Sequence, residues 1–317
     1  MATCDLQRAE YNFLREDPRL GKNIAYLTLA GSISYGTDNE KSDTDIRGFA
    51  VESVDDLLTG KAFEQVEDRT TDTVIYGLRK FFHLCTGGNP NVIELLGTEP
   101  EHILYMNEVG KKVRDNAEIF LSKRAFKSFA GYATAQLRRL QNALAHDSYP
   151  EREKNQHILK SIESMMMTNR EDYEAISFKL TDDEILISVD AKELPLRKFL
   201  AMNSSLTTML NNYDKLNHRN RKKDDEHLNK HAMHLVRLYL TGIDILEGRG
   251  VITYREKDLP LLRKIRAGEV PFEDIFKMAD EFEEQMLSAY KNSKLPDNPD
   301  VAKIDKLLLE IYHEWRR

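Results

Sequence analysis

Apolar residues form short runs near the N-terminus and change to helical spacing further along the chain. Residues 23–30 are a compact apolar run that ends at Gly31, which predicts a buried strand followed by a turn. A polar, turn-rich loop follows at 37–42. A second strand is predicted over 43–51, where apolar residues partly alternate with polar ones. A third is predicted over 71–76, which is rich in β-branched and aromatic residues.

Beyond Gly77 apolar residues recur every three or four positions, which is typical of amphipathic helices. The first helix is predicted to end at Gly87 and Gly88, and the next to begin at Asn89 and Pro90, with Asn89 as its cap. Further helices and one short strand are predicted over the segments 6–14, 124–145, 152–167, 184–189 (the strand), 194–213, 227–246, 272–290 and 304–315.

Strands therefore come first and helices follow, which predicts an α+β fold. We expect a core with a small mixed sheet over residues 1–100, and a mainly helical domain over residues 101–317. A chain of 317 residues with 41% hydrophobic and 31% charged residues is globular and long enough for two such domains.

Composition excludes some functions. The formal net charge of -7 argues against a strongly basic nucleic-acid binder, although a local basic groove is compatible with it. The two cysteines, Cys4 and Cys85, are too few for a disulfide framework or a Cys-rich zinc site. We find neither a signal peptide nor an apolar run long enough to span a bilayer, so we expect a cytoplasmic protein without a membrane partner.

The stretch Gly-Ser-Ile-Ser-Tyr-Gly at 31–36 directly follows the first predicted strand. Glycine lets the backbone approach a phosphate closely, and a helix N-terminus presents free N–H groups. The hydroxyl of Ser32 adds a further donor. The stretch does not match the P-loop pattern that ends in Lys-Ser or Lys-Thr. Gly31 and Ser32 thus form either a phosphate-binding turn or an ordinary one.

Asp43 and Asp45 are two positions apart in the predicted strand 43–51. The two-residue period of a strand would place both carboxylates on one face. Two like charges this close repel each other unless a positive charge lies between them, and Mg²⁺ prefers carboxylate, phosphate and water oxygens. The pair predicts a metal site; the alternative is two solvated acids at a strand end.

Asp72 opens the third predicted strand and is the candidate for a third carboxylate. In a two-metal site one ion activates the attacking hydroxyl, and the other holds the triphosphate and the leaving pyrophosphate. An acid at a strand start can also have no special role. The nearby alternatives are Glu64, Glu67 and Asp68, and we prefer Asp72 because a strand directly follows it.

Together, Gly-Ser at 31–32, Tyr-Gly at 35–36 and Ser-Asp-Thr-Asp-Ile-Arg-Gly at 42–48 resemble the signature of the polymerase-beta nucleotidyltransferase superfamily. This resemblance implies that the Gly-Ser pair binds the triphosphate and that the two aspartates bind the metals.

Segments further along narrow the resemblance. They are Arg79-Lys80-Phe81, Gly88-Asn89-Pro90-Asn91, Glu94-Leu95-Leu96, Tyr132 with Gln136, and residues 230–238. With the core motif they are similar to the RNA repair pathway DNA polymerase beta family of predicted nucleotidyltransferases, over residues 27–268. The resemblance implies a ferredoxin-like α/β catalytic core and a helical domain that closes over the nucleotide.

Basic residues on the predicted helix 227–246 form a second group of candidates for nucleotide binding. Lys230, His234 and Arg237 are spaced i, i+4, i+7 and share a face. A cationic face directed at a triphosphate would neutralise charge during transfer, whereas the alternative is an ordinary polar helix face. Arg47 lies close to the acid pair, where it could contact phosphate or balance the carboxylates.

Tyr35 and Glu94 are expected mainly to have structural roles. An aromatic residue after a turn usually packs in the core, although Tyr35 could pack against a base. Glu94 follows a predicted helix start, and a functional role for it is the alternative.

The leading hypothesis is a metal-dependent nucleotidyltransferase that moves NMP from an NTP to an acceptor hydroxyl, such as an RNA end, and releases pyrophosphate. It would use two Mg²⁺ ions, with Mn²⁺ as an alternative ion. Asp43 and Asp45 would hold both metals, and Asp72 would help to deprotonate the acceptor. Two further hypotheses are nucleotidylation of a protein or a small molecule, and a nucleotide-binding module without catalysis.

Overall fold

The computed structural model describes residues 4–144, 158, 159, 162, 176–181, 184–189, 195–216 and 225–315. The chain divides into two compact units, one made of Met1–Ala133 with Ala232–Arg317 and the other of Thr134–His231. These units describe how the chain packs. The division near residue 100 into a catalytic and a helical domain stays a prediction about function.

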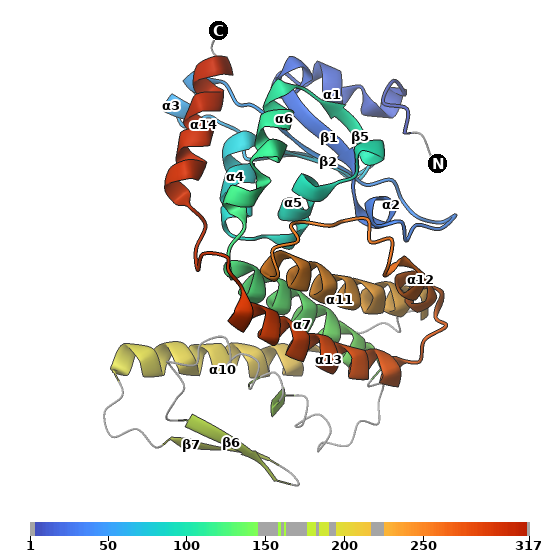
Figure 1. The fold of residues 1–317 in the computed structure, drawn as a ribbon, viewed down its shortest axis with the longest axis vertical. Coiled ribbons are helices and arrows are strands. Elements are labelled where there is room, and N and C mark those ends of the chain that lie inside the picture. Colours follow the sequence, from blue (N-terminus) through green and yellow to red (C-terminus); the bar gives the residue numbers. More distant parts are fainter. Residues whose placement is uncertain are drawn as a thin grey trace. The chain divides into compact units, whose positions relative to one another are not determined.

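A five-stranded mixed sheet lies in the first unit (Figure 1). Its strands are in the order β3-β4-β2-β1-β5. The strands are β1 (Ile24–Leu29), β2 (Ile46–Ala50), β3 (Gln65–Asp68), β4 (Thr73–Gly77) and β5 (Ile103–Met106). β2 and β4 run parallel, whereas the other neighbouring pairs are antiparallel. A mixed sheet followed by a mainly helical region confirms the α+β class that the sequence predicts.

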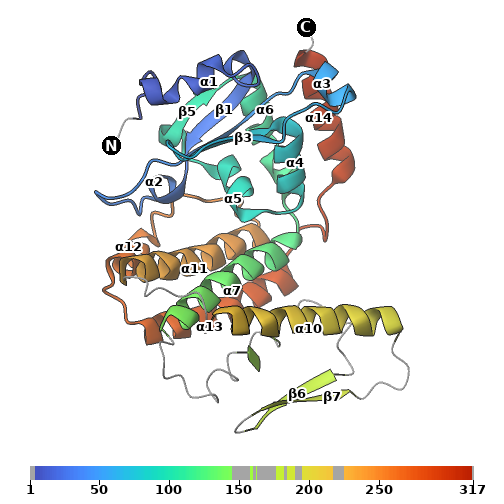
Figure 2. The ribbon, with the colours of Figure 1, turned by 180° about the vertical axis from the view of Figure 1, so that it is seen from behind.

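The helices belong to both units, and α10 lies in the second. The helices up to residue 120 are η1 (Ala9–Tyr11), α1 (Phe13–Glu16), η2 (Gly21–Asn23), α2 (Gly31–Tyr35), α3 (Val54–Leu58), α4 (Leu78–Thr86), α5 (Pro90–Ile93), η3 (Glu94–Gly97), η4 (Pro100–His102), α6 (Glu108–Asp115) and η5 (Ala117–Phe120). The later ones are α7 (Arg124–Leu144), α10 (Leu196–Leu216), α11 (Asp225–Leu246), α12 (Leu259–Ala267), α13 (Phe272–Asn292) and α14 (Val301–Trp315). α14 contacts α4 and lies beside it in both views (Figures 1 and 2).

Apolar side chains cover both faces of the sheet. On one face, Leu27 and Ile46 pack with Tyr11 and Leu14 from the N-terminal segment. Because side chains alternate along a strand, Phe49 of β2 points to the opposite face from Ile46. On that face α4 packs against the sheet, so the central strands are buried on both faces. This packing fixes the strand ends at which the site lies.

The opposite face is aromatic. The ring of Phe49 lies 4.5 Å from that of Phe81 on α4 and 5.6 Å from that of Tyr26 on β1, measured between centroids. All three side chains are fully buried. Aromatic groups of this size bury much apolar area and stabilise the contact between the sheet and α4.

In the second unit, β6 (Ile176–Leu180) pairs antiparallel with β7 (Ile185–Val189). Ile158 and Ile162 are buried, and Phe178, Ile185 and Leu206 of the hairpin and α10 pack against them. These contacts form a small apolar cluster within this unit.

Most predicted elements are confirmed, with three corrections. The predicted strand 43–51 begins only at Ile46. β3 and β5 are edge strands of four residues that the sequence pattern does not predict. β3 has one apolar residue, Val66, and the apolar run of β5 is short and lies where a mainly helical region is expected. The sequence analysis also misses α6, α12 and β6. Most of the predicted helix 152–167 lies outside the described residues. Among the described residues no helix has the length and apolarity needed to cross a membrane.

Candidate active site

Three segments of the predicted site meet at one end of the sheet. Ala30, just after β1, donates its N–H to the carbonyl oxygen of Asp45 at 2.9 Å, and Ile46 donates its N–H to that of Asp72 at 3.1 Å. Because β2 and β4 run parallel and in register, Asp45 and Asp72 precede neighbouring strands at the same end of the sheet. The strand pairing thus brings Gly31, Asp45 and Asp72 together.

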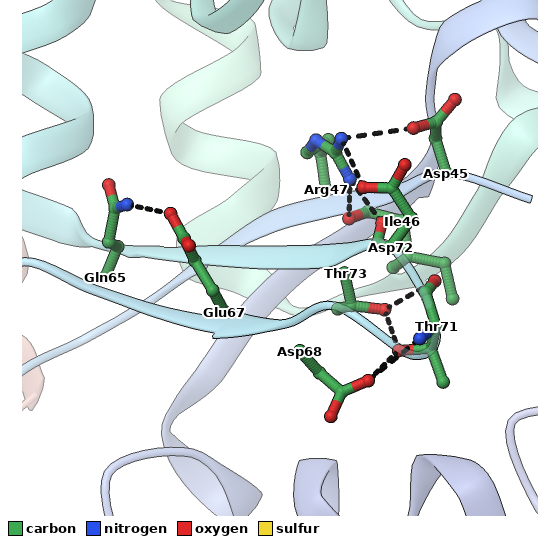
Figure 3. A network of polar contacts seen from close by, with 9 residues as sticks. All are labelled: Asp45, Ile46, Arg47, Gln65, Glu67, Asp68, Thr71, Asp72 and Thr73. Atoms are coloured by element: carbon green, nitrogen blue, oxygen red, sulfur yellow. Dashed lines mark hydrogen bonds and ion pairs between the residues drawn. The ribbon is translucent and has the colours of Figure 1, made fainter.

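Arg47 joins the two carboxylates (Figure 3). Its Nη2 lies 3.1 Å from Oδ1 of Asp45 and 2.9 Å from Oδ1 of Asp72. Its Nη1 donates to the main-chain oxygens of Ile46, at 2.9 Å, and of Asp72. One guanidinium therefore offsets the repulsion between two neighbouring carboxylates.

Asp72 has an unusual backbone conformation. Its φ is 44°, which makes it the one residue other than glycine with positive φ in the described part of the chain. Aspartate tolerates this left-handed region better than most residues, yet the conformation still costs free energy. Arg47 contacts both the main-chain oxygen and the carboxylate of Asp72 and so holds the turn between β3 and β4. Strained residues of this kind cluster at functional sites.

Gly31 opens α2 directly against Asp45. Its φ is 59°, and a Cβ at this position would lie 2.0 Å from Oδ2 of Asp45. The backbone conformation and the close approach both require glycine. α2 ends at Gly36, which caps the helix with φ of 69°. The carboxylate of Asp45 thus lies directly beside Gly31, the first residue of α2 and of the predicted phosphate-binding segment.

Asp43 lies in the loop before β2. β2 begins at Ile46, so Asp43 and Asp45 precede the strand, and strand alternation does not place them on one face. The reason is local, because the polar residues at 37–45 favour turns. In one of these turns the N–H of Lys41 donates to Oδ1 of Asn39 at 3.0 Å. Asp43 is exposed. Among the residues that the structure describes, no three His, Cys, Asp or Glu side chains are grouped so that they could hold a metal ion.

The other acids considered for the third position have partners elsewhere (Figure 3). Asp68 accepts the N–H and hydroxyl of Thr71, at 2.8 and 2.9 Å, within the hairpin turn. Glu64 pairs with Lys80 at 3.0 Å, and Glu67 with Gln65. Of the four candidates, Asp72 is the acid that shares a partner with Asp45.

The three basic candidates of the C-terminal region lie on one helix, α11, as predicted. Lys230 is exposed and belongs to the second unit. His234 and Arg237 belong to the first unit, where His234 is half-buried and Arg237 is buried. Nucleotide contact by these residues stays a prediction.

Arg237 is part of a buried polar group that the sequence analysis misses. Its Nη1 donates to Oε1 of Glu94, and the hydroxyl of Tyr35 donates to Oε2 of Glu94 at 2.7 Å. The guanidinium carbon of Arg237 lies 3.8 Å from the centroid of the Tyr35 ring. Sequence separations of 59 and 143 residues explain why no local pattern reveals it. Tyr35 packs in the core, as expected.

Burial keeps the hydroxyl of Tyr35 protonated. Desolvation raises the pKa of Tyr35 well above its ordinary value of 10.0; the charge of Arg237 opposes this rise, and the charge of Glu94 adds to it. Tyr35 therefore remains a hydrogen-bond donor to the Glu94 carboxylate at physiological pH.

The geometry agrees with the chain's relationship to known proteins. Residues 6–171, slightly more than half of the chain, match the family described as RNA repair pathway DNA polymerase beta family. The chain belongs to this family. The matched residues include Gly31, Asp45, Arg47, Asp72 and Glu94. The family's name refers to the polymerase-beta type and to RNA repair.

One curated relative is similar over a shorter stretch. It is the uncharacterized 38.9 kDa protein in the nrdC-mobD intergenic region of Enterobacteria phage T4, which is 30% identical over 119 residues. The aligned part covers 33% of this chain and 35% of the relative, so the chain spans about a third of that relative's length. No solved structure is significantly similar to the chain.

Polymerase-beta chemistry implies divalent cations, and the donor set at this end of the sheet fits them in part. Asp45 and Asp72 supply carboxylate oxygens, which hard cations such as Mg²⁺ prefer, and both carboxylates already share one positive group. Their side chains are 23% and 53% exposed, so a cation from solvent can reach them. Asp43 is not grouped with them in this structure.

Proposed function

We propose that the protein transfers a nucleoside monophosphate from an NTP to an acceptor hydroxyl, with release of pyrophosphate. The observation that carries this proposal is the arrangement of Asp45 and Asp72 around Arg47, with Asp45 in contact with Gly31 at the start of α2. It combines two carboxylates for cations with a helix start for phosphate, which are the two requirements for binding an NTP with its metal ions.

In this proposal the acceptor oxygen forms a bond to the α-phosphorus. The bond between the α-phosphorus and the oxygen that bridges to the β-phosphorus breaks, and pyrophosphate leaves with that electron pair. Asp72, which is the more exposed of the two acids, accepts the proton of the acceptor hydroxyl. Gly31 and Ser32 hold the β and γ phosphates through backbone N–H groups and the Ser32 hydroxyl.

Asp45 and Asp72 would hold two Mg²⁺ ions, or Mn²⁺ in their place, and Asp43 would join them from its loop. When bound, such ions neutralise charge on the triphosphate and lower the pKa of the attacking hydroxyl. Arg47 keeps both carboxylates at one place and offsets their repulsion. Lys230 and His234 remain our candidates for contacts to the nucleotide.

We further propose an RNA end as the acceptor, because the family's name refers to RNA repair. A protein or small-molecule acceptor is the alternative outcome of the same test. Since RNA binding releases counterions from phosphates, the affinity for RNA should fall as salt is raised.

The test is transfer of label from α-labelled ATP, GTP, CTP and UTP, each supplied singly with Mg²⁺, to a mixed pool of RNA and protein. Label on RNA supports the proposal with its acceptor, and label on protein replaces the acceptor. No label on any acceptor with any NTP contradicts the proposal.

A matched pair of variants ties the activity to the site. Asp72→Asn removes the proposed base, whereas Asp68→Asn changes an acid in the same hairpin whose partner is Thr71. We expect Asp72→Asn to abolish transfer and Asp68→Asn to keep most of it. Equal activity of the two variants would rule out the role of Asp72.

A further inference from the structure

A buried triad of Tyr35, Glu94 and Arg237 connects α11 to the helix of the proposed phosphate site. Glu94 is 2% exposed and Arg237 4%. Glu94 accepts one bond from the guanidinium and one from the Tyr35 hydroxyl, and the guanidinium also lies over the Tyr35 ring. His234, one turn earlier on α11, packs against the same ring in a T-shaped arrangement, with 6.2 Å between the ring centroids.

This triad is a costly way to stabilise a core. Burying two charges carries a desolvation penalty that their attraction often fails to recover, and apolar side chains of similar volume frequently stabilise more. Nε of Arg237 is also buried without a hydrogen-bond partner among the described residues, which adds to the cost. The triad is therefore better explained by what it holds in place than by global stability.

What it holds is α2. A helix of five residues is not stable alone, because nucleation costs more than so few hydrogen bonds return. The position of α2 must then come from tertiary contacts. Tyr35 is its last residue, and Gly31, which lies against Asp45, is its first. Fixing Tyr35 therefore fixes the distance between Gly31 and the carboxylate.

A second contact secures the same end of α2. Arg263 of α12 donates from Nε to the carbonyl oxygen of Gly36 at 2.9 Å. The ring of Tyr254 lies so close to Gly36 that a Cβ there would be 2.5 Å from it. Two C-terminal segments, α11 and the chain from Tyr254 to Arg263, thus converge on the end of α2.

We infer that Glu94 and Arg237 are positioning residues, which hold Tyr35 so that the backbone N–H groups of Gly31 and Ser32 stay ready for the NTP phosphates. This inference rests on the proposed function and deepens it. It gives Arg237 a role that acts through α2 rather than by direct contact with the nucleotide.

The chain offers a matched control for testing this. Tyr312 donates its hydroxyl to the buried carboxylate of Glu52 at 2.6 Å, much as Tyr35 donates to Glu94 at 2.7 Å. Glu52 follows β2, whereas Asp45 precedes it, so the control lies at the other end of the strand. Tyr35→Phe and Tyr312→Phe each remove one hydroxyl from a buried carboxylate and keep the ring, so both variants should fold.

Two readouts are measured on the full chain: deuterium uptake of peptides covering residues 31–36, and the Kd for ATP, GTP, CTP and UTP with Mg²⁺. We expect Tyr35→Phe to speed uptake in this segment and to raise Kd roughly threefold to tenfold, because part of the free energy of one hydrogen bond to a charged group acts on NTP binding through the position of α2. Tyr312→Phe should leave the uptake at 31–36 and the Kd unchanged. Each of the two tyrosine variants should lower the melting temperature. Glu94→Gln should act like Tyr35→Phe.

Four outcomes are distinct. The expected pattern supports the inference. Equal uptake at 31–36 in the two tyrosine variants overturns it, and so does faster uptake in Tyr35→Phe with an unchanged Kd. Faster uptake in Tyr35→Phe, with no binding of any NTP by the wild type, refutes the proposed function and with it the role in NTP binding, but leaves the anchoring of α2 by the triad standing.

Discussion

Strand β2 is flanked by a carboxylate at each end, and each carboxylate lies against a glycine where a helix begins. Before the strand, Asp45 lies against Gly31 at the start of α2; after it, Glu52 lies against Gly77, which caps α4. Glu52 accepts the N–H groups of Leu78 at 2.8 Å and Arg79 at 3.3 Å, and the hydroxyl of Tyr312 at 2.6 Å.

The two ends differ in access and in neighbours. Glu52 is 2% exposed, and groups of the chain itself occupy its oxygens. The Asp45 side chain is partly exposed and shares Arg47 with a second carboxylate. The same local arrangement therefore serves as a helix cap where it is sealed. Where it opens to solvent beside another acid, we propose that it takes part in binding the cations and phosphates of an NTP.

Among substitutions that leave the carboxylates of the site in place, the largest effect should come from Gly31→Ala. Its Cβ would collide with Oδ2 of Asp45, in addition to the cost of a left-handed alanine. We expect transfer to fall by roughly 100-fold or more, which corresponds to ~3 kcal/mol of barrier. Gly60→Ala is the control, because Gly60 has φ of 71° and nothing within 4 Å of its added Cβ. It should lower stability by about 1 kcal/mol and keep activity. Equal activity of the two variants would mean that the contact between Gly31 and Asp45 is not needed.

Substitutions of Arg47 distinguish two explanations of its role at the Asp45 end of β2, which is open to solvent. If its fork must contact both the carboxylates, through Nη2, and the main-chain oxygens, through Nη1, Arg47→Lys should lose nearly as much activity as Arg47→Gln, roughly tenfold, because an ammonium group lacks the planar fork. Steady-state transfer rates at several Mg²⁺ concentrations measure this. Full activity in Arg47→Lys would show that neutralising the charge is enough.

At the sealed end the effect should appear in stability. Glu52→Gln replaces a carboxylate that accepts two backbone N–H groups and a hydroxyl, and so weakens these hydrogen bonds. The free energy of unfolding should therefore fall by roughly 1–3 kcal/mol. Urea unfolding measures it. Transfer per folded molecule should not change, and a large loss of transfer would remove the distinction between the two ends.

The smallest effect is a dependence on pH. Burial raises the pKa of Glu52 above its ordinary value of 4.5, while its hydrogen bonds lower it less. The folded state then holds this proton more tightly than the unfolded state, so stability from this group is present at low pH. It is lost as pH rises from about 4.5 through the folded pKa. The stability advantage of the wild type over Glu52→Gln should shrink as pH rises above 4.5. An advantage that grows with pH would contradict the raised pKa.

The sequence predicts the parts of the site that depend on neighbouring residues. The apolar run of β1, the glycine after it and the acids before β2 and β4 each produce a local pattern, and the structure brings Gly31, Asp45 and Asp72 together. The predicted strand 43–51 starts three residues before β2 does, because an alternating pattern does not show where pairing with β1 begins.

What the sequence could not show depends on distant contacts. The ion pair of Glu94 with Arg237 joins positions 143 apart, and a glutamate or arginine that becomes buried looks like any surface charge. The left-handed conformation of Asp72 and the bridging of two acids by Arg47 likewise follow from the pairing of β2 with β4.

The most direct test of the central claim measures NMP transfer and thermal unfolding for Asp45→Asn and Glu52→Gln side by side. We predict that Asp45→Asn loses transfer roughly 1000-fold or more while its melting temperature stays close to that of the wild type, since it removes a ligand for cations that stabilise the transition state. Glu52→Gln should melt earlier and still transfer. If Asp45→Asn transfers as the wild type does, the open end of β2 is not the active site.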